Sequence, residues 1–279
     1  MTTVETTTKP KLSFLALYLT DKCQQRCTHC ATGSSPEGTH GTMTTADWKR
    51  VLDQAAELWV RRVQFIGGEP MLHPGLAELV GHALGHALEV EVFSNLVWVP
   101  EALWPILSQP GVSLATSYYS DRPEQHAGIT GVDTLPRIRA TIARATGLGI
   151  PLRAGVIDLG VGQRFEQATR NLVDLGVPSI GHDRVRALGR AAPCTTGGSN
   201  AAELCGRCGD GQATIAPDGQ VRPCLFVTWA TAGNVRERGL GEVVAAMPGV
   251  RAELIAQGMP TTLAGNCQPD GNCYPYNDR

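Results

Sequence analysis

Three cysteines near the start of this 279-residue chain have a spacing that suits an iron-sulfur cluster. Cys23, Cys27 and Cys30 form a C-x3-C-x2-C motif directly after the apolar run 12–19. Thiolates at this spacing fit three corners of a cubane cluster and leave the fourth iron without a protein ligand. Because an open iron can coordinate a small molecule and pass it an electron, the motif indicates a site for chemistry.

This motif resembles the signature of the radical S-adenosylmethionine (SAM) enzymes. A second motif, Gly67-Gly68-Glu69-Pro70, follows the strand-like run 62–66 and is similar to the GGEP element of that family. The resemblance implies that the element binds the methionine amino group of SAM. Two glycines at this point would let backbone carbonyls approach a ligand closely.

Two other uses of the cysteines compete with an iron-sulfur cluster. Zinc could be bound by the motif together with His29 or His40, although zinc motifs usually contain paired C-x2-C units. A disulfide framework is disfavoured, because nine cysteines is an odd number and the chain is far longer than the small secreted domains that depend on disulfides.

The composition is typical of a soluble enzyme. Hydrophobic residues make up 42% of the chain and the formal charge is -2, so no electrostatic bias favours nucleic acid or membranes as partners. The run 12–19 superficially resembles a signal peptide, but no small-residue cleavage site follows it. We expect no transmembrane helix, since no apolar run reaches 18 residues, and a reducing cytoplasm suits so many thiols.

Strand and helix patterns alternate between about residues 12 and 184. Apolar or β-branched runs predict strands at 12–20, 62–66, 89–94, 112–118, 151–157 and 178–183. Helical patterns lie between them at about 44–60, 75–86, 101–108, 134–147 and 163–175, and Thr44 with Asp47 forms a capping box for the first. Six βα units predict an α/β fold with a parallel sheet, and the resemblance implies a partial (β/α)6 TIM-like barrel.

Residues at the carboxyl ends of the strands are further candidates, because ligands bind there in parallel α/β folds. Ser94 and Asn95 end the third strand, where the resemblance implies contacts with the SAM ribose and a plain turn is the alternative. Ser117 ends the fourth strand. Arg153 needs an anionic partner if it is buried, and the resemblance implies the SAM carboxylate. His29, within the cysteine motif, completes the candidate SAM contacts.

The pattern changes after residue 186. Residues 187–204 are rich in Gly, Ala, Thr and Ser and predict a linker, so we expect a catalytic core at 12–186 and a second module at 187–279. A Pro-Asp-Gly turn at 217–219 predicts a hairpin that folds its flanking cysteines together. Six of the nine cysteines lie in the second module: Cys194, Cys205, Cys208, Cys224, Cys267 and Cys273.

The second module resembles the auxiliary-cluster module called SPASM, or its shortened form, twitch. Gly219 and Cys224 match the G-x4-C spacing of that module. A full SPASM module draws on more cysteines than the six found here. The resemblance therefore implies one auxiliary [4Fe-4S] cluster at least. Four of the six cysteines would ligate this cluster. The first candidates are Cys208 and Cys224, the next are Cys205 and Cys267, and the last are Cys194 and Cys273. A zinc ribbon is the alternative, since C-x2-C followed by a distant pair is also a zinc spacing.

The resemblance also implies an activity. A [4Fe-4S] cluster on the first three cysteines, reduced by a donor such as flavodoxin or ferredoxin, would cleave SAM to a 5'-deoxyadenosyl radical that abstracts hydrogen from a substrate. The stretches 125–131, 183–186 and 189–190 resemble ones common in maturases of ribosomally made peptides. We therefore predict a peptide maturase that forms a crosslink, an oxidation or an epimer, with a peptide groove at the edge strand or loops about 118–129.

Two alternatives to peptide maturation remain. Only 22 residues precede Cys23, too few for the winged-helix recognition domain that many maturases carry. The chain could instead be a small-molecule dehydrogenase or epimerase that acts on an aminocyclitol or a sugar in antibiotic biosynthesis. A non-enzymatic iron-sulfur or zinc-binding module is the third interpretation, and the GGEP element disfavours it because an electron carrier needs no SAM site.

Overall fold

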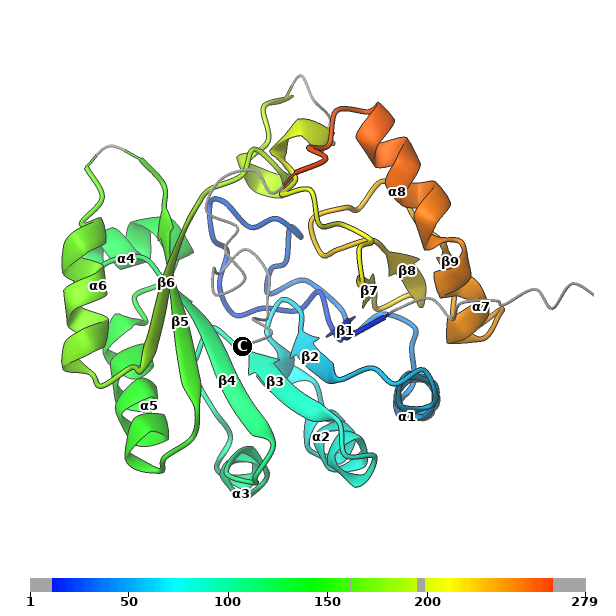
Figure 1. Cartoon of the computed structure of the whole chain (residues 1–279). Helices are drawn as coiled ribbons and strands as arrows, with labels where there is room; N and C mark the ends of the chain where they lie inside the picture. Colours follow the sequence, from blue (N-terminus) through cyan, green and yellow to red (C-terminus); the bar gives the residue numbers. More distant parts are fainter. Residues whose placement is uncertain (1–11, 161, 195–198, 263–279) are drawn as a thin grey trace, which may run out of the picture.

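The computed structural model describes residues 12–160, 162–194 and 199–262, and this part of the chain contains one sheet of nine strands. The strand order is β6-β5-β4-β3-β2-β1-β7-β8-β9, and the sheet does not close into a barrel (Figure 1). Six parallel strands coincide with the six predicted runs: β1 (Phe14–Tyr18), β2 (Arg62–Ile66), β3 (Glu89–Phe93), β4 (Val112–Tyr118), β5 (Leu152–Asp158) and β6 (Ser179–Arg184). The predicted α/β fold is confirmed.

Helices follow the strands as βα units require. The helices are α1 (Thr45–Glu57), α2 (Leu76–Gly85), α3 (Trp104–Leu107), α4 (Pro123–Thr130), α5 (Leu135–Gly147), α6 (Phe165–Asp174), α7 (Leu240–Ala245) and α8 (Met247–Ala256). In Figure 1, α1, α2, α3, α5 and α6 lie along the outer side of the curved sheet. Their apolar faces form one large core with the strands. None of the described helices is long and apolar enough to cross a membrane.

Helix α1 shows why the local sequence folds as predicted. The Thr44 hydroxyl accepts a hydrogen bond from the Asp47 amide at 3.1 Å, and the Asp47 carboxylate accepts one from the Thr44 amide at 2.9 Å. This capping box satisfies two amides that the first turn leaves without partners. The predicted apolar face is buried against the sheet.

Helix α4 was not predicted from the sequence. It has little amphipathic character, so its apolar residues show no helical period. Its ends carry the usual signals: Pro123 occupies the first turn, and Gly131 ends the helix with a left-handed φ of 79°. The helix covers most of the stretch 118–129, where we expected an edge strand or loops.

The expected edge strand near 118–129 is also a wrong prediction. Strand β4 contributes Tyr118 to this region, and it lies between β3 and β5 with both sides paired. Among the described strands, β6 and β9 are the ones at the ends of the sheet.

The C-terminal strands continue the sheet. Strand β7 (Gln212–Ile215) pairs with β1 in parallel, and β8 (Gln220–Arg222) and β9 (Gly233–Asn234) follow in antiparallel order. The predicted hairpin turn joins β7 to β8, with Gly219 at a φ of 86° that favours glycine. A second, smaller apolar cluster lies in this region and comprises Leu188, Ala201, Leu204, Cys208, Cys224, Val227, Leu254 and Met259.

Candidate active site at the cysteine motif

The cysteine loop is fixed by backbone hydrogen bonds to two other segments. The Cys23 amide donates to the Ser35 carbonyl at 2.9 Å. The amides of Arg26 and Thr28 each donate at 2.9 Å to carbonyls at the end of α4, those of Thr130 and Ile129. Helix α4 therefore positions the segment on either side of Cys27, which is a role that the sequence did not reveal.

The three thiols face one cavity. Cys23 is buried, and Cys27 and Cys30 are half-buried. All three line one cavity, part of which is open to solvent. Burial, together with the negative charges of the neighbouring thiolates, raises the pKa of Cys27 to about 12. Burial raises the pKa of Cys23 to about 12 as well.

Arg190 approaches the same thiols. Its amide donates to the Cys30 carbonyl at 3.0 Å, and its guanidinium donates to the Ser34 carbonyl. Burial raises the pKa of Cys30, but hydrogen bonds from Thr32 and Arg190 outweigh burial and lower it. The stretch 189–190 was noted only for its family resemblance, so this positive charge beside the thiols is a feature that the sequence analysis missed.

The GGEP element packs directly against the cysteine loop. The Gly68 amide donates to the Thr20 carbonyl at 2.6 Å, and the Glu69 amide donates to the Lys22 carbonyl at 2.9 Å. A Cβ atom on Gly67 would lie 2.7 Å from the Thr20 oxygen, and one on Gly68 would lie 2.5 Å from the Lys22 oxygen. The two glycines are therefore needed for the backbone of one motif to touch the other.

Glu69 faces inward and organises the turn. Its carboxylate accepts hydrogen bonds from the Met71 amide at 2.9 Å, the Ser94 hydroxyl at 2.8 Å and the Asn95 amide at 2.8 Å. Burial raises the pKa of Glu69 to about 7, although these hydrogen bonds act to lower it. Gly67 and Gly68 line the cavity, whereas Glu69 and Pro70 lie outside its lining. We infer a positioning role for the Glu69 side chain.

Ser94, Asn95 and Ser117 reach the cavity as the strand-end rule predicts. The Asn95 side-chain amide lies 3.6 Å from the Cys23 sulfur and thereby connects the end of β3 to the cysteine loop. His29 also lines the cavity, with its ring 4.9 Å from that of Tyr119. Burial and then the charge of Arg190 lower the pKa of His29 to about 4.

Arg153 has a protein partner rather than an open carboxylate site. Its guanidinium makes two hydrogen bonds of 2.8 Å to the carboxylate of Glu91, which is 2% exposed. Arg153 lies outside the lining of the cavity. A buried arginine requires an anionic partner, and the Glu91 carboxylate on β3 is that partner.

The hairpin brings two C-terminal cysteines together as predicted. The Cys208 and Cys224 sulfurs are 2.9 Å apart. Cys205 is buried nearby, and the contacts with Cys205 and Cys224, followed by burial, raise the pKa of Cys208 well above its usual value. Cys194 is exposed. Cys267 and Cys273 lie outside the described residues.

Neither group of thiols resembles the site of a single ion. Among the described residues, one set of three His, Cys, Asp or Glu side chains places its ligand atoms within 4.8 Å of one another, and it contains no cysteine. Neither the first motif with His29 or His40 nor Cys205, Cys208 and Cys224 forms such a set, although the Cys208 and Cys224 sulfurs are 2.9 Å apart. Cys23, Cys27 and Cys30 share one cavity, which leaves room for the several irons of a cluster.

Comparison with known proteins identifies the family. The sequence model of the radical SAM superfamily matches residues 17–175, which is more than half of the chain, and the chain belongs to this superfamily. A model of the SPASM iron-sulfur cluster-binding domain matches residues 205–274. The two families imply [4Fe-4S] clusters and SAM, which the thiol arrangement and the cavity fit.

Related proteins include peptide-modifying enzymes. The PqqA peptide cyclase of Gluconobacter oxydans is 33% identical over 147 residues, which is 51% of this chain and 41% of that protein. The chain therefore spans about two fifths of the length of the curated relatives it matches.

Solved structures show the shared fold. That of Streptococcus suis SuiB bound to the precursor peptide SuiA has a TM-score of 0.73 at 16% identity, and the match covers 88% of this chain and 67% of that one. Native anSMEcpe with bound AdoMet has a TM-score of 0.69 at 13% identity, over 86% and 82% of the two chains.

Proposed function

We propose that this radical SAM protein matures a ribosomally made peptide by forming a crosslink, an oxidation or an epimer. The observation that carries the proposal is the placement of Cys23, Cys27 and Cys30 around one cavity at the carboxyl ends of the strands. The similarity to a peptide cyclase supports a peptide as the substrate class.

Each part of the cavity has a role in this proposal. Cys23, Cys27 and Cys30 hold the cluster, which when bound supplies the electron that cleaves SAM to the hydrogen-abstracting 5'-deoxyadenosyl radical. The backbone of Gly67 and Gly68 and the polar groups of Ser94, Asn95, Ser117 and His29 contact SAM. Apolar side chains that include Ile66, Phe93, Ile157 and Phe226 exclude water from the reacting groups.

The C-terminal region holds an auxiliary cluster in this proposal. We place the boundary between core and module at residues 186 and 187, although β7, β8 and β9 continue the sheet of the core and the module shares many of its apolar residues with the main core. Cys205, Cys208 and Cys224 would be joined by Cys267, with Cys273 and Cys194 as the other candidates. Leu225 and Phe226 follow Cys224 directly and line the SAM cavity, so an auxiliary cluster here is close enough to exchange an electron with the substrate.

We further propose a flavodoxin or ferredoxin as the electron donor and the cytoplasm as the compartment. No disulfide joins any of the seven described cysteines, which suits a reducing compartment.

Turnover with a candidate peptide tests the proposal. Cluster-loaded protein, SAM and a reductant are incubated with the short peptide encoded beside the gene, and the products are analysed by mass spectrometry. We expect a product about two hydrogens lighter for a crosslink or oxidation, or a gain of about one dalton in deuterated water for an epimer, with 5'-deoxyadenosine formed in step. If SAM turnover ignores the peptide but rises with an aminocyclitol, the small-molecule alternative replaces peptide maturation.

A further inference from the structure

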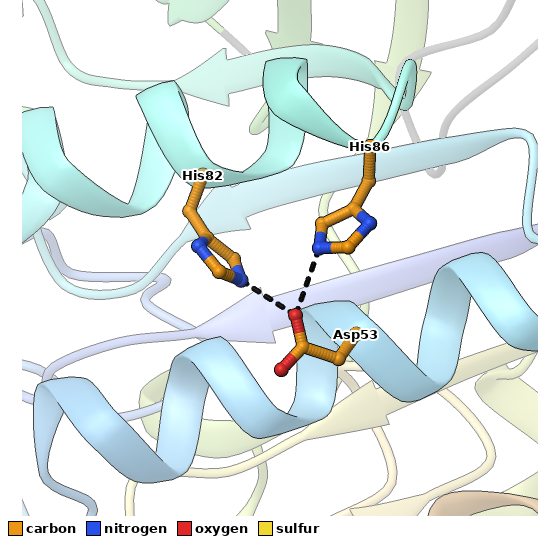
Figure 2. Close-up of side chains that lie close together, drawn as sticks. All are labelled: Asp53, His82 and His86. Carbon is orange, nitrogen blue, oxygen red and sulfur yellow. Dashed lines mark hydrogen bonds and ion pairs between the residues drawn. The ribbon is translucent and has the colours of Figure 1, made fainter.

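Two histidines and an aspartate form a separate cluster between α1 and α2. His82 and His86 lie one turn apart on α2 and its C-terminal cap, and Asp53 faces them from α1 (Figure 2). The Nε2 atoms of His82 and His86 lie 2.6 Å and 2.8 Å from the same oxygen, Oδ1 of Asp53. The ligand atoms of the three side chains all lie within 4.8 Å of one another.

The charge of Asp53 is available to a cation. Within the described part of the chain its carboxylate pairs with the two imidazoles, whereas the neighbouring lysine, Lys49, is paired with Glu78 at 2.5 Å. Burial raises the pKa of Asp53, but hydrogen bonds from His82 and His86 outweigh this and lower it, so the carboxylate is ionised. The side chains of His82, His86 and Asp53 are 27%, 37% and 44% exposed, which leaves an ion a path from solvent.

We propose that Asp53, His82 and His86 bind one divalent transition-metal ion of the zinc type. Two imidazole nitrogens and a carboxylate oxygen are ligands that zinc accepts, and three protein ligands leave a fourth position for water. Tetrahedral zinc with ligands at about 2.0–2.1 Å needs ligand atoms about 3.3 Å apart. The present separations of 2.6 Å and 2.8 Å reach this value through small side-chain rotations.

Binding requires no rearrangement of the backbone. An imidazole that donates an Nε2 proton to Asp53 can carry its proton on Nδ1 instead once Nε2 coordinates the ion. The ion would then connect α1 to α2 on the outer side of the sheet. None of the three residues lines the SAM cavity, so this site is independent of the proposed function.

Zinc binding to the cluster-loaded protein tests the site, because iron then occupies the competing thiols. Zinc(II) is titrated by equilibrium dialysis, and its ligands are identified by zinc K-edge X-ray absorption. We expect one zinc per chain with nitrogen and oxygen ligands at about 2.0–2.1 Å and no sulfur at about 2.3 Å. Zinc should also raise the thermal unfolding temperature, since it binds the folded state.

Three variants locate the ligands. Asp53→Asn, His82→Gln and His86→Gln should each weaken zinc binding at least about tenfold. The glutamine amide of His86→Gln can still donate to Asp53, so this variant preserves the contact between α1 and α2. His182→Gln is the matched control: this exposed histidine on β6 contacts Thr169 and belongs to no such cluster. Circular dichroism and unchanged iron content check that each variant is folded. Zinc bound through sulfur, no zinc bound, or equal affinity in wild type and the three variants would overturn the proposal.

Discussion

Cys23, Cys27 and Cys30 line a cavity, whereas Cys205, Cys208 and Cys224 are buried outside its lining. The first group is held by contacts with the ends of several other elements, including α4, β3 and the loop that carries Arg190. The second group flanks the hairpin of β7 and β8, and Arg251 of α8 donates to the Gly206 and Cys208 carbonyls at 2.8 Å. The same ligand type therefore occurs in an open and in an enclosed setting.

This difference separates the two proposed roles. A cluster on the open thiols has room for SAM at its fourth iron, and polar and apolar groups of several strands surround that room. Cys205, Cys208 and Cys224 lie outside the lining of this cavity, and we assign electron exchange to a cluster on them. The predictions below test whether the roles are as distinct as the settings.

The largest effect is expected from removing the open thiols. Cys23→Ala, Cys27→Ala and Cys30→Ala combined should abolish 5'-deoxyadenosine formation and lower the iron content from about eight to about four per chain. Iron analysis and chromatography of the products measure both. Loss of all iron would show that the two sites do not fold independently.

Removing the enclosed thiols should separate SAM cleavage from product formation. Cys208→Ala with Cys224→Ala should also leave about four irons, but slow 5'-deoxyadenosine formation should persist while modified substrate is lost. If this variant makes product at the wild-type rate, the auxiliary role is wrong.

A smaller effect is expected from filling the contact between the two motifs. Gly68→Ala places a Cβ 2.5 Å from the Lys22 oxygen, so the turn must move, and we expect SAM affinity to fall about tenfold and stability by about 1–3 kcal/mol. Gly147→Ala at the end of α5 is the control, because no atom lies within 4 Å of the added carbon. Equal behaviour of the two variants would contradict the close packing of the motifs.

The last prediction concerns stability alone, through its dependence on pH. The pKa of Glu69 rises from 4.5 to about 7 on burial, so the folded state favours the protonated acid. The resulting stabilisation is fully present below about pH 4.5 and is lost as the pH rises through about 7, a change of the order of 3 kcal/mol. Glu69→Gln has no titrating carboxyl group at this position and should lack this pH-dependent stabilisation. Its thermal unfolding temperature should therefore rise relative to that of wild type between about pH 5 and pH 8. A constant difference between the two would refute the assignment.

Local signals in the sequence predicted the strands and the hairpin. Each strand is a short apolar run, and the Pro-Asp-Gly turn determines its own conformation, so neighbouring residues carry the information. The thiol motif and the GGEP element were found for the same reason.

Contacts between distant segments were not predictable in this way. Arg153 pairs with Glu91, which is 62 positions earlier and meets it only because β3, β4 and β5 are adjacent in the sheet. The spacing of His82 and His86 was visible in the sequence, but Asp53 joins them only through the packing of α1 against α2. Helix α4 lacked an amphipathic period, so its support of the cysteine loop emerged from the structure alone.

The response of the reduced cluster signal to SAM is the most direct test of the open-iron site. Electron paramagnetic resonance spectra are recorded for the reduced Cys208→Ala and Cys224→Ala double variant, in which the cluster on Cys23, Cys27 and Cys30 should be the remaining one. We expect SAM to change the g-values of this signal, because SAM would coordinate the iron that has no protein ligand. An identical spectrum with and without saturating SAM would contradict it.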